Sequence, residues 1–209
     1  MKKLSSIFLA IFLIVMVSPL CAQMQIGPKA GLNIANITGD GVQGLNLETK
    51  TAFNGGIFFM YQFNKLFAIQ PEAYYTMKGA TANIMNVDVT FTYDYVEVPV
   101  LLKLIIPVEG SSIKPSIFAG PSLGFNTTAK VKGESGNASA EEDIKDYTKS
   151  TEFSLAFGGG IGFNVGHNEL GFDVRYVLGL TTTDDSPGTD AEVKNTVISI
   201  NVYWGFILL

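Results

Sequence analysis

Regular alternation of apolar and polar residues is the feature that most constrains how this chain can fold. In residues 67–78, FAIQPEAYYTMK, Phe67 and Ile69 fall on one parity, and Gln70 and Glu72 fall on the other. Successive side chains of a β-strand point to opposite faces, so this segment is predicted to be a strand with one apolar and one polar face. Seven further segments alternate in the same way: 25–35, 52–63, 93–106, 113–130, 152–165, 170–181 and 196–208. The pattern predicts an all-β fold of eight strands.

The connections between these segments alternate in length. Three are tight, at 64–66, 107–112 and 166–169, and four are long, at 36–51, 79–92, 131–151 and 182–195. Tight turns on one side and long loops on the other are typical of antiparallel, up-and-down transmembrane β-barrels in bacterial outer membranes, where the turns face the periplasm. Strands of about 11 residues, tilted by roughly 40°, are long enough to cross the apolar layer of such a membrane.

The apolar faces carry no charged residue over the central parts of the strands. A lysine or arginine on the lipid face at mid-membrane costs about 2–4 kcal/mol, so this pattern favours apolar faces that contact lipid. The polar faces combine Gly, Ser and Asn with long charged residues, as expected for a narrow lumen that side chains fill. The alternative is a soluble, lipocalin-like lipid-binding barrel, in which the apolar faces would point inward.

The first 22 residues have the pattern of a secretory signal peptide. A basic start precedes the apolar run 7–17, and Ala22 ends a cleavage region. The run is too short for a comfortable membrane span. We therefore predict a signal peptide, 1–22, followed by one outer-membrane barrel domain, 23–209. Lipoprotein processing at Cys21, the only cysteine, is the alternative, and both routes take the chain out of the cytoplasm.

Charged residues on the polar faces are the candidates for chemistry inside the lumen. They are Glu72, Glu97, Lys103, Lys114, Asp173 and Arg175. Because burying a charge without a partner is costly, we expect these side chains to pair with one another and to fill the lumen. A gated polar pathway or a catalytic carboxylate pair is the other interpretation.

The sequence contains no motif that predicts a catalytic, cofactor or metal site. His167, the only histidine, lies in a predicted turn without the partners that a catalytic triad or a zinc site needs. The run Gly158-Gly159-Gly160 lacks the Lys-Ser/Thr pair that follows in a phosphate-binding loop. The acidic runs 141–146 and 184–190 lack the full spacing of a calcium loop. No basic patch is present, so nucleic acid is not an expected partner.

Six blocks of the sequence carry a resemblance to a known family. They are GPKAGLNIANITGD (27–40), IQPEAYYTMKGA (69–80), YVEVPVLLKL (95–104), PSIFAGPSLGF (115–125), AFGGGIGF (156–163) and DVRYVLGLT (173–181). In this order they resemble the PorT-like outer-membrane β-barrel family of the Bacteroidota, whose barrels are of the small OmpA/OmpX type. The resemblance implies a bacterial outer-membrane location. The family's namesake is linked to protein export by the type IX system.

Together these observations predict a non-enzymatic outer-membrane barrel with a structural or surface-interaction role. The four long loops carry net charges of −1, −1, −2 and −3 in chain order, so we expect acidic extracellular loops. The expected partners are outer-membrane lipid and lipopolysaccharide, surface or secretion partners at the four loops, and the barrel-insertion machinery at the C-terminal strand. A narrow pore or an accessory of a type IX-like secretion system is the alternative function.

Overall fold

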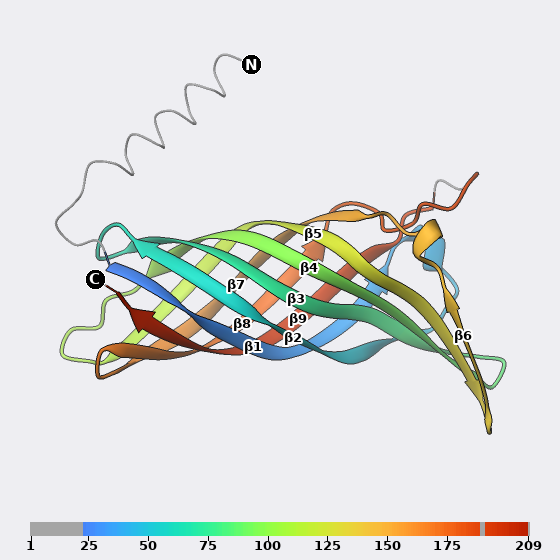
Figure 1. The fold of residues 1–209 in the computed structure, drawn as a ribbon, viewed down its shortest axis with the longest axis horizontal. Helices are drawn as coiled ribbons and strands as arrows, with labels where there is room; N and C mark the ends of the chain where they lie inside the picture. Colours follow the sequence, from blue (N-terminus) through green and yellow to red (C-terminus); the bar gives the residue numbers. More distant parts are fainter. Residues whose placement is uncertain (1–22, 189–190, 209) are drawn as a thin grey trace, which may run out of the picture.

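The computed structural model describes residues 23–188 and 191–208, which form mainly β-strands (Figure 1). The strands are β1 (Gln23–Thr38), β2 (Leu47–Gln62), β3 (Phe67–Ile84), β4 (Val87–Ile105), β5 (Ile113–Ser135), β6 (Ala138–Asp143), β7 (Thr151–Val165), β8 (Asn168–Gly179) and β9 (Lys194–Ile207). Two short 3₁₀ helices, η2 (Asp40–Val42) and η3 (Lys145–Tyr147), lie in connections. Within the described residues, no helix is both long and apolar enough to cross a membrane. The predicted signal peptide lies outside the described residues.

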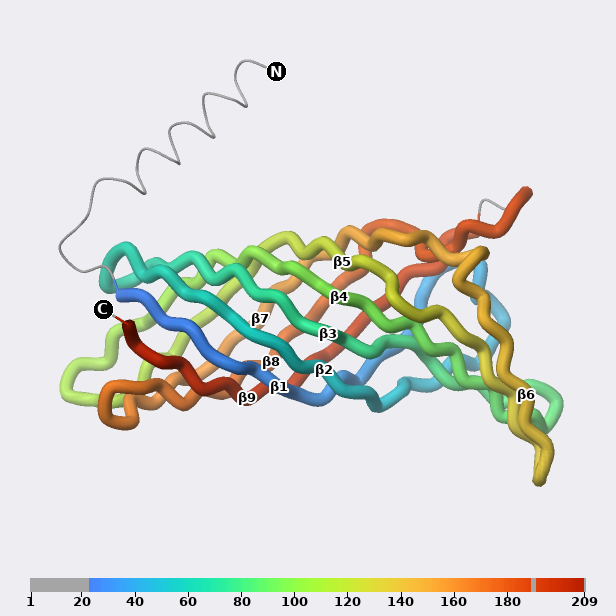
Figure 2. Tube along the Cα trace, in the orientation of Figure 1, coloured from blue at the N-terminus to red at the C-terminus, as the bar shows by residue number. Residues whose placement is uncertain are grey.

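Eight of the strands close into a ring in which neighbouring strands are antiparallel. The order around the ring is β1, β2, β3, β4, β5, β7, β8 and β9, and β9 pairs back with β1. The ring begins and ends at the same end of the molecule, where the short connections after β2, β4 and β7 also lie (Figure 2). The prediction of an all-β, antiparallel, up-and-down fold is confirmed, and the ring has the eight predicted strands.

Two of the predicted long loops contain regular strand structure instead. β3 and β4 continue to a two-residue turn at Met85 and Asn86, with Ile84 paired to Val87, so the prediction of a long loop at 79–92 is wrong. Both turn residues have positive φ, of 52° and 64°, as a tight type I′ hairpin requires. In the predicted loop 131–151, β5 continues to Ser135 and pairs with the unpredicted ninth strand, β6. These two hairpins project beyond the ring at the end opposite the short turns (Figure 1).

The two faces of the ring strands differ as the alternation predicts. On β3, Ile69 is 39% exposed on the outer face, whereas its neighbour Gln70 is 4% exposed on the inner face. The same outward exposure holds for large apolar residues all around the ring, among them Leu32, Ile57, Val98, Leu123, Phe153, Val174 and Ile200. An apolar band therefore encircles the ring, while polar and charged side chains share its interior with buried apolar ones such as Phe58, Leu101 and Phe118. This orientation is the opposite of that in a soluble lipid-binding cup.

A register shift between Asp94 and Tyr95 marks the outer limit of this band on β4 and β5. Asp94 pairs with Thr128 and Tyr95 pairs with Asn126, so β5 contains one extra residue at this point. Around and beyond the shift lies a cluster of buried apolar residues. It consists of Ile37, Ala80, Tyr93, Tyr95 and Ala129, with Val42, Leu47, Phe91, Ile144 and Val193 packed against them. We call these ten residues the apolar cap of the outer mouth.

Candidate functional site: the charged lumen

The interior of the ring is lined by charged side chains of both signs. The basic residues are Lys29, Lys78, Lys103, Lys114 and Arg175, and the acidic residues are Glu72, Glu97, Glu152, Glu169 and Asp173. All are nearly fully buried except Lys114, whose side chain is partly exposed. Five positive and five negative charges balance within this set. They reach the interior because they occupy the inward parity of their strands.

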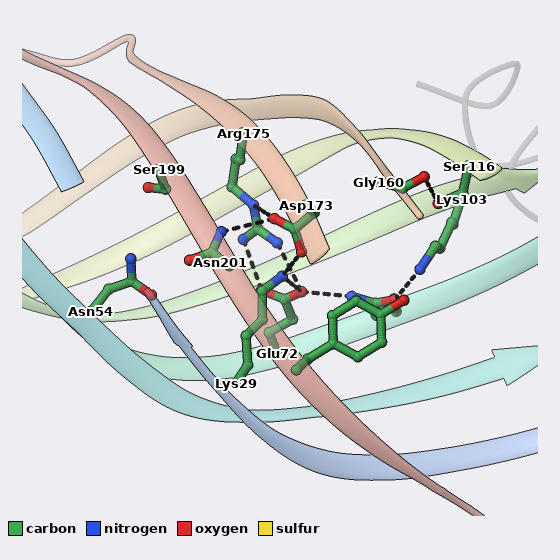
Figure 3. Close-up of polar contacts among 12 residues, drawn as sticks. Lys29, Asn54, Glu72, Lys103, Ser116, Gly160, Asp173, Arg175, Ser199 and Asn201 are labelled. Atoms are coloured by element: carbon green, nitrogen blue, oxygen red, sulfur yellow. Dashed lines mark hydrogen bonds and ion pairs between the residues drawn. The ribbon is translucent and has the colours of Figure 1, made fainter. Parts of the chain in front are cut away.

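The central cluster joins strands from opposite sides of the ring (Figure 3). Arg175 of β8 binds Glu72 of β3 in a bidentate manner, through Nη1–Oε2 at 2.7 Å and Nη2–Oε1 at 2.9 Å. Lys29 of β1 bridges the two carboxylates, with Nζ 3.1 Å from Glu72 and 2.6 Å from Asp173. The amide of Asn201 donates to Asp173 at 2.8 Å. Each of the four charged groups therefore has a partner of opposite sign, which offsets the cost of burial.

A second cluster lies nearer the outer mouth, around Lys78. Its ammonium group forms ion pairs with Glu97 and, at 3.1 Å, with Glu152. The hydroxyl of Tyr74 donates to Glu97 at 2.6 Å. The ring of Tyr95 lies 4.8 Å from the same ammonium group, within the range of a cation–π contact. This cluster closes the lumen just below the apolar cap.

A third cluster lies at the end of the ring that holds the chain termini. Glu169 accepts hydrogen bonds from Lys114 at 3.1 Å, from Tyr203 at 3.0 Å and from Gln25 at 3.3 Å. Lys103 contacts Gln70 at 3.4 Å and lies 5.3 Å from the centre of the Tyr203 ring. Its ammonium group therefore links this cluster to the central one.

The inward glycines provide the room that these large side chains need. A Cβ at Gly171 would lie 2.0 Å from the Tyr203 ring, and one at Gly162 would lie 2.6 Å from the Glu169 carboxylate. Any larger residue at either position would displace the side chain that fills the lumen there. Gly162 is among the glycines that alternate with apolar residues in β7, so its position follows from the sequence pattern. The role of Gly171 becomes visible only from the packing.

The six residues predicted for the lumen all lie inside the ring but in different clusters. Glu72, Asp173 and Arg175 meet in the central cluster, and Glu97 joins the outer one. Lys114 lies at the opposite end, and Lys103 forms hydrogen-bond and ring contacts rather than an ion pair.

Four charged residues of these clusters were missed as candidates. They are Lys29, Lys78, Glu152 and Glu169. The signal for three of them was present, because Lys29 and Lys78 share the polar parity of their strands and Glu152 precedes the outward Phe153. Glu169 was assigned to a turn, but it belongs to β8 and pairs with Gly205.

The remaining space in the centre of the lumen is small. The cavity among Lys29, Glu72, Tyr74 and Arg175 has a volume of about 10 Å³. This is room for about one water molecule and not for an organic ligand. Elsewhere, His167 is exposed in the turn between β7 and β8, and Gly158-Gly159-Gly160 lie within β7, as the sequence suggests. Among the described residues, no group of three or more His, Cys, Asp or Glu side chains is placed to hold a metal ion.

Comparison with protein families agrees with this architecture. The family model described as an outer membrane protein beta-barrel domain matches residues 20–185, which is most of the chain. The chain belongs to this outer-membrane β-barrel family. Its place in a bacterial outer membrane follows from that membership. The matched region contains β1 to β8, and β9 completes the barrel by pairing with both β8 and β1.

Solved structures of other outer-membrane barrels are similar to this barrel at low sequence identity. Ail, the attachment invasion locus protein of Yersinia pestis, is 19% identical with a TM-score of 0.45, over 87% of this chain and 98% of Ail. Neisserial surface protein A is 13% identical with a TM-score of 0.49, over 88% and 97%. The N-terminal barrel domain of Pseudomonas aeruginosa OprF is 9% identical with a TM-score of 0.40, over 89% and 100%. No curated protein sequence matches the chain.

Proposed function

We propose that this protein is a non-conducting, non-enzymatic transmembrane barrel that holds a structured interaction surface outside the bacterial outer membrane. The barrel would act as the anchor, and the projecting hairpins and loops would contact partners. The observation that carries this proposal is the lumen, which paired charges and aromatic rings fill almost completely. A barrel with this interior offers no open path for solutes.

The membrane-spanning orientation is supported by the outer surface of the barrel. Large apolar side chains point outward on all eight ring strands. In water, this apolar band would be exposed to solvent, whereas in a membrane it contacts lipid. In outer-membrane barrels the short turns and the termini face the periplasm. The projecting hairpins at the opposite end would then lie outside the cell.

The projecting structure is well suited to contact partners because it is ordered and polar. All six residues of β6 are exposed, and three of them, Glu141, Glu142 and Asp143, are acidic. Lys130 of β5 pairs with Glu141 across the hairpin at 2.6 Å. The hydrogen bond from Gly41 N to Glu192 O joins the loops 36–51 and 182–195 to each other, and the bond from Lys149 N to Thr183 O joins the second of these loops to the 131–151 connection. We propose this surface, the predicted acidic loops included, for contacts with lipopolysaccharide or with surface or secretion partners.

We also propose a narrower family membership and a recognition role for the C-terminal strand. Membership of the PorT-like group of the Bacteroidota is supported by the order of the six sequence blocks, and a role beside a type IX-like secretion system would follow from it. Recognition of the C-terminal strand by the insertion machinery is supported by the alternating residues of β9, such as Trp204 and Phe206.

Planar bilayer recordings of the purified protein test the non-conducting barrel. We expect no steady openings from the natural sequence. The double variant Glu72→Ala with Arg175→Ala removes both members of the bidentate ion pair in the central cluster, so neither charge is left without its partner. Because these two side chains fill the centre of the lumen, their removal should produce ion-conducting openings. Slower gel migration after boiling would verify that both proteins form folded barrels. Steady openings from the natural sequence would contradict the proposal and favour the narrow pore.

A further inference from the structure

A pocket of about 240 Å³ lies at the outer mouth, outside the filled lumen. Its apolar floor includes Tyr93 of β4, Ile144 and Val193, all of which belong to the apolar cap. Its rim includes Tyr147 of η3 together with Asp184 and Ser186 of the β8–β9 connection. The cap separates this pocket from the charged clusters below, so a ligand here would rest on the barrel rather than pass through it.

Backbone hydrogen bonds hold the two walls of the pocket together. Lys149 N donates to Thr183 O at 2.9 Å, and Asp185 N donates to Tyr147 O at 2.9 Å. Thr148 and Asp184 form an antiparallel bridge between these two bonds. The η3 segment and the β8–β9 connection therefore form a short ladder of their own, and the pocket exists before any ligand binds.

The polar groups of the pocket are suited to a positive charge. One carboxylate oxygen of Asp184 accepts a hydrogen bond from the Ser186 hydroxyl at 2.7 Å. Within the described residues, Asp184 has no ion pair with a lysine, an arginine or the histidine. The connections that form the walls, 131–151 and 182–195, have net charges of −2 and −3. An anionic ligand would be repelled by this charge.

Two tyrosine rings line the same pocket as this carboxylate. Tyr147 is 53% exposed at the rim, and Tyr93 is buried at the floor. Tyr93 lies beyond the membrane band, where burial, and then the nearby Asp184 carboxylate, raise the pKa of its phenol to about 12. The phenol therefore stays neutral, and its ring can contact a cation. Aromatic faces attract organic ammonium groups through cation–π contacts, and a nearby carboxylate adds an opposite charge.

We propose that this pocket binds an organic ammonium group carried on a short apolar stem. The charged head would contact Asp184 and the rings of Tyr93 and Tyr147, and the stem would contact Ile144 and Val193. A free amine and the side chain of a peptide lysine both have this chemistry. The inference rests on the proposed surface-interaction role, and it specifies the chemistry of one partner.

Calorimetric titration of the purified barrel in dodecyl maltoside, a detergent without an ammonium group, tests this site. The probe is choline, and its neutral analogue 3,3-dimethylbutan-1-ol has the same shape without the charge. We expect saturable binding of choline and at least about fivefold weaker binding of the analogue. Nα-acetyl-lysine methylamide forms a second arm. Its binding would indicate a peptide lysine as a source, and binding of choline alone would indicate a free amine.

Two matched variants keep the test specific. Asp184→Asn removes the charge but retains an acceptor for Ser186, and it should weaken choline binding by at least about fivefold. Asp185→Asn removes the same charge one residue away, outside the pocket lining, and should change binding by less than about twofold. Absence of saturable choline binding, equal binding of the neutral analogue, or equal effects of both variants would overturn the proposal. The bilayer recordings are independent of this result, so the two failures are distinguishable.

Discussion

β4 and β5 each run through two regions of the molecule, and the polarity of their two faces changes between these regions. On the membrane side of the register shift at Asp94, Val96 and Phe125 point outward and Glu97 is buried inside. Beyond the shift, Tyr93 and Ala129 are buried inside the apolar cap, whereas Lys130 pairs with Glu141 on the outside. Along these two strands, the outer face changes from apolar to polar. The inner face combines charges such as Glu97 with apolar residues such as Leu101 and Phe118 inside the band, and it carries no charged residue beyond the shift.

This change along the strands matches a change of surroundings from lipid to water. In lipid, an outward apolar side chain costs nothing and an outward charge costs several kcal/mol, so charges collect inside and must pair. In water, burial of apolar surface is the main stabilising contribution, so apolar side chains collect inside. The register shift in β5 lets that strand change its inward parity where the surroundings change.

Removing one partner of the central pair should have the largest effect. Arg175→Met leaves the buried carboxylates of Glu72 and Asp173 with Lys29 as their remaining ion-pair partner, and it should lower the free energy of unfolding by about 3–5 kcal/mol. Urea titration of the barrel refolded in phospholipid vesicles, followed by gel migration without boiling, measures this loss. The matched variant adds Glu72→Leu to Arg175→Met and should recover at least half of the loss, since Lys29 keeps Asp173. A double variant no more stable than Arg175→Met would count against charge pairing as the source of the stability.

A charge on the outer face should have the next largest effect, and only within the apolar band. Val100→Lys places an ammonium group against lipid and should cost about 2–4 kcal/mol, seen as reduced folding into vesicles. Val108→Lys is the control, because Val108 is 44% exposed and Val100 is 39% exposed, but Val108 lies in the short connection between β4 and β5. Comparable losses in both variants would show that the band does not contact lipid.

The alternation of apolar and polar residues in the sequence predicted the barrel and the side chains in its lumen well. Alternation located the eight ring strands and separated outward residues such as Val100 from inward ones such as Glu97, because period-two patterning directly reports which face a side chain occupies. Lys78 and Glu152 needed only the same rule, applied to the ends of strands. Which charges pair with each other was not predictable from the sequence. The pairing of Lys29 with both Glu72 and Asp173, for example, depends on how strands distant in the sequence are positioned relative to one another in the ring.

The structure outside the membrane was predicted much less well, for a physical reason. In β5 beyond Val131 and in β6, both faces contain polar residues, so the alternation that marks a strand becomes weak. The stretch 87–94 of β4, VDVTFTYD, alternates regularly, so that part of the β3–β4 hairpin was readable from the sequence. The turn at Met85 and Asn86 lacks a glycine, and β6 contains no large apolar residue. The apolar cap combines residues from strands and connections far apart in the sequence, such as Val42, Tyr93, Ile144 and Val193, which no local pattern brings together.

Weakening the apolar cap should have the smallest effect, and the effect should stay local. Ile144→Ser removes a partly buried apolar side chain from the cap, which corresponds to about 1 kcal/mol of lost burial. If the cap is a separate unit on top of a membrane-anchored barrel, the 131–151 connection should become more sensitive to protease and its amides should exchange faster. The urea midpoint of the barrel should remain unchanged. Val108→Ser, at the opposite end, should alter neither quantity. An equal fall in the urea midpoint and in protease resistance would show instead that the cap and the charged lumen unfold together, and the two regions would then form one cooperative structure.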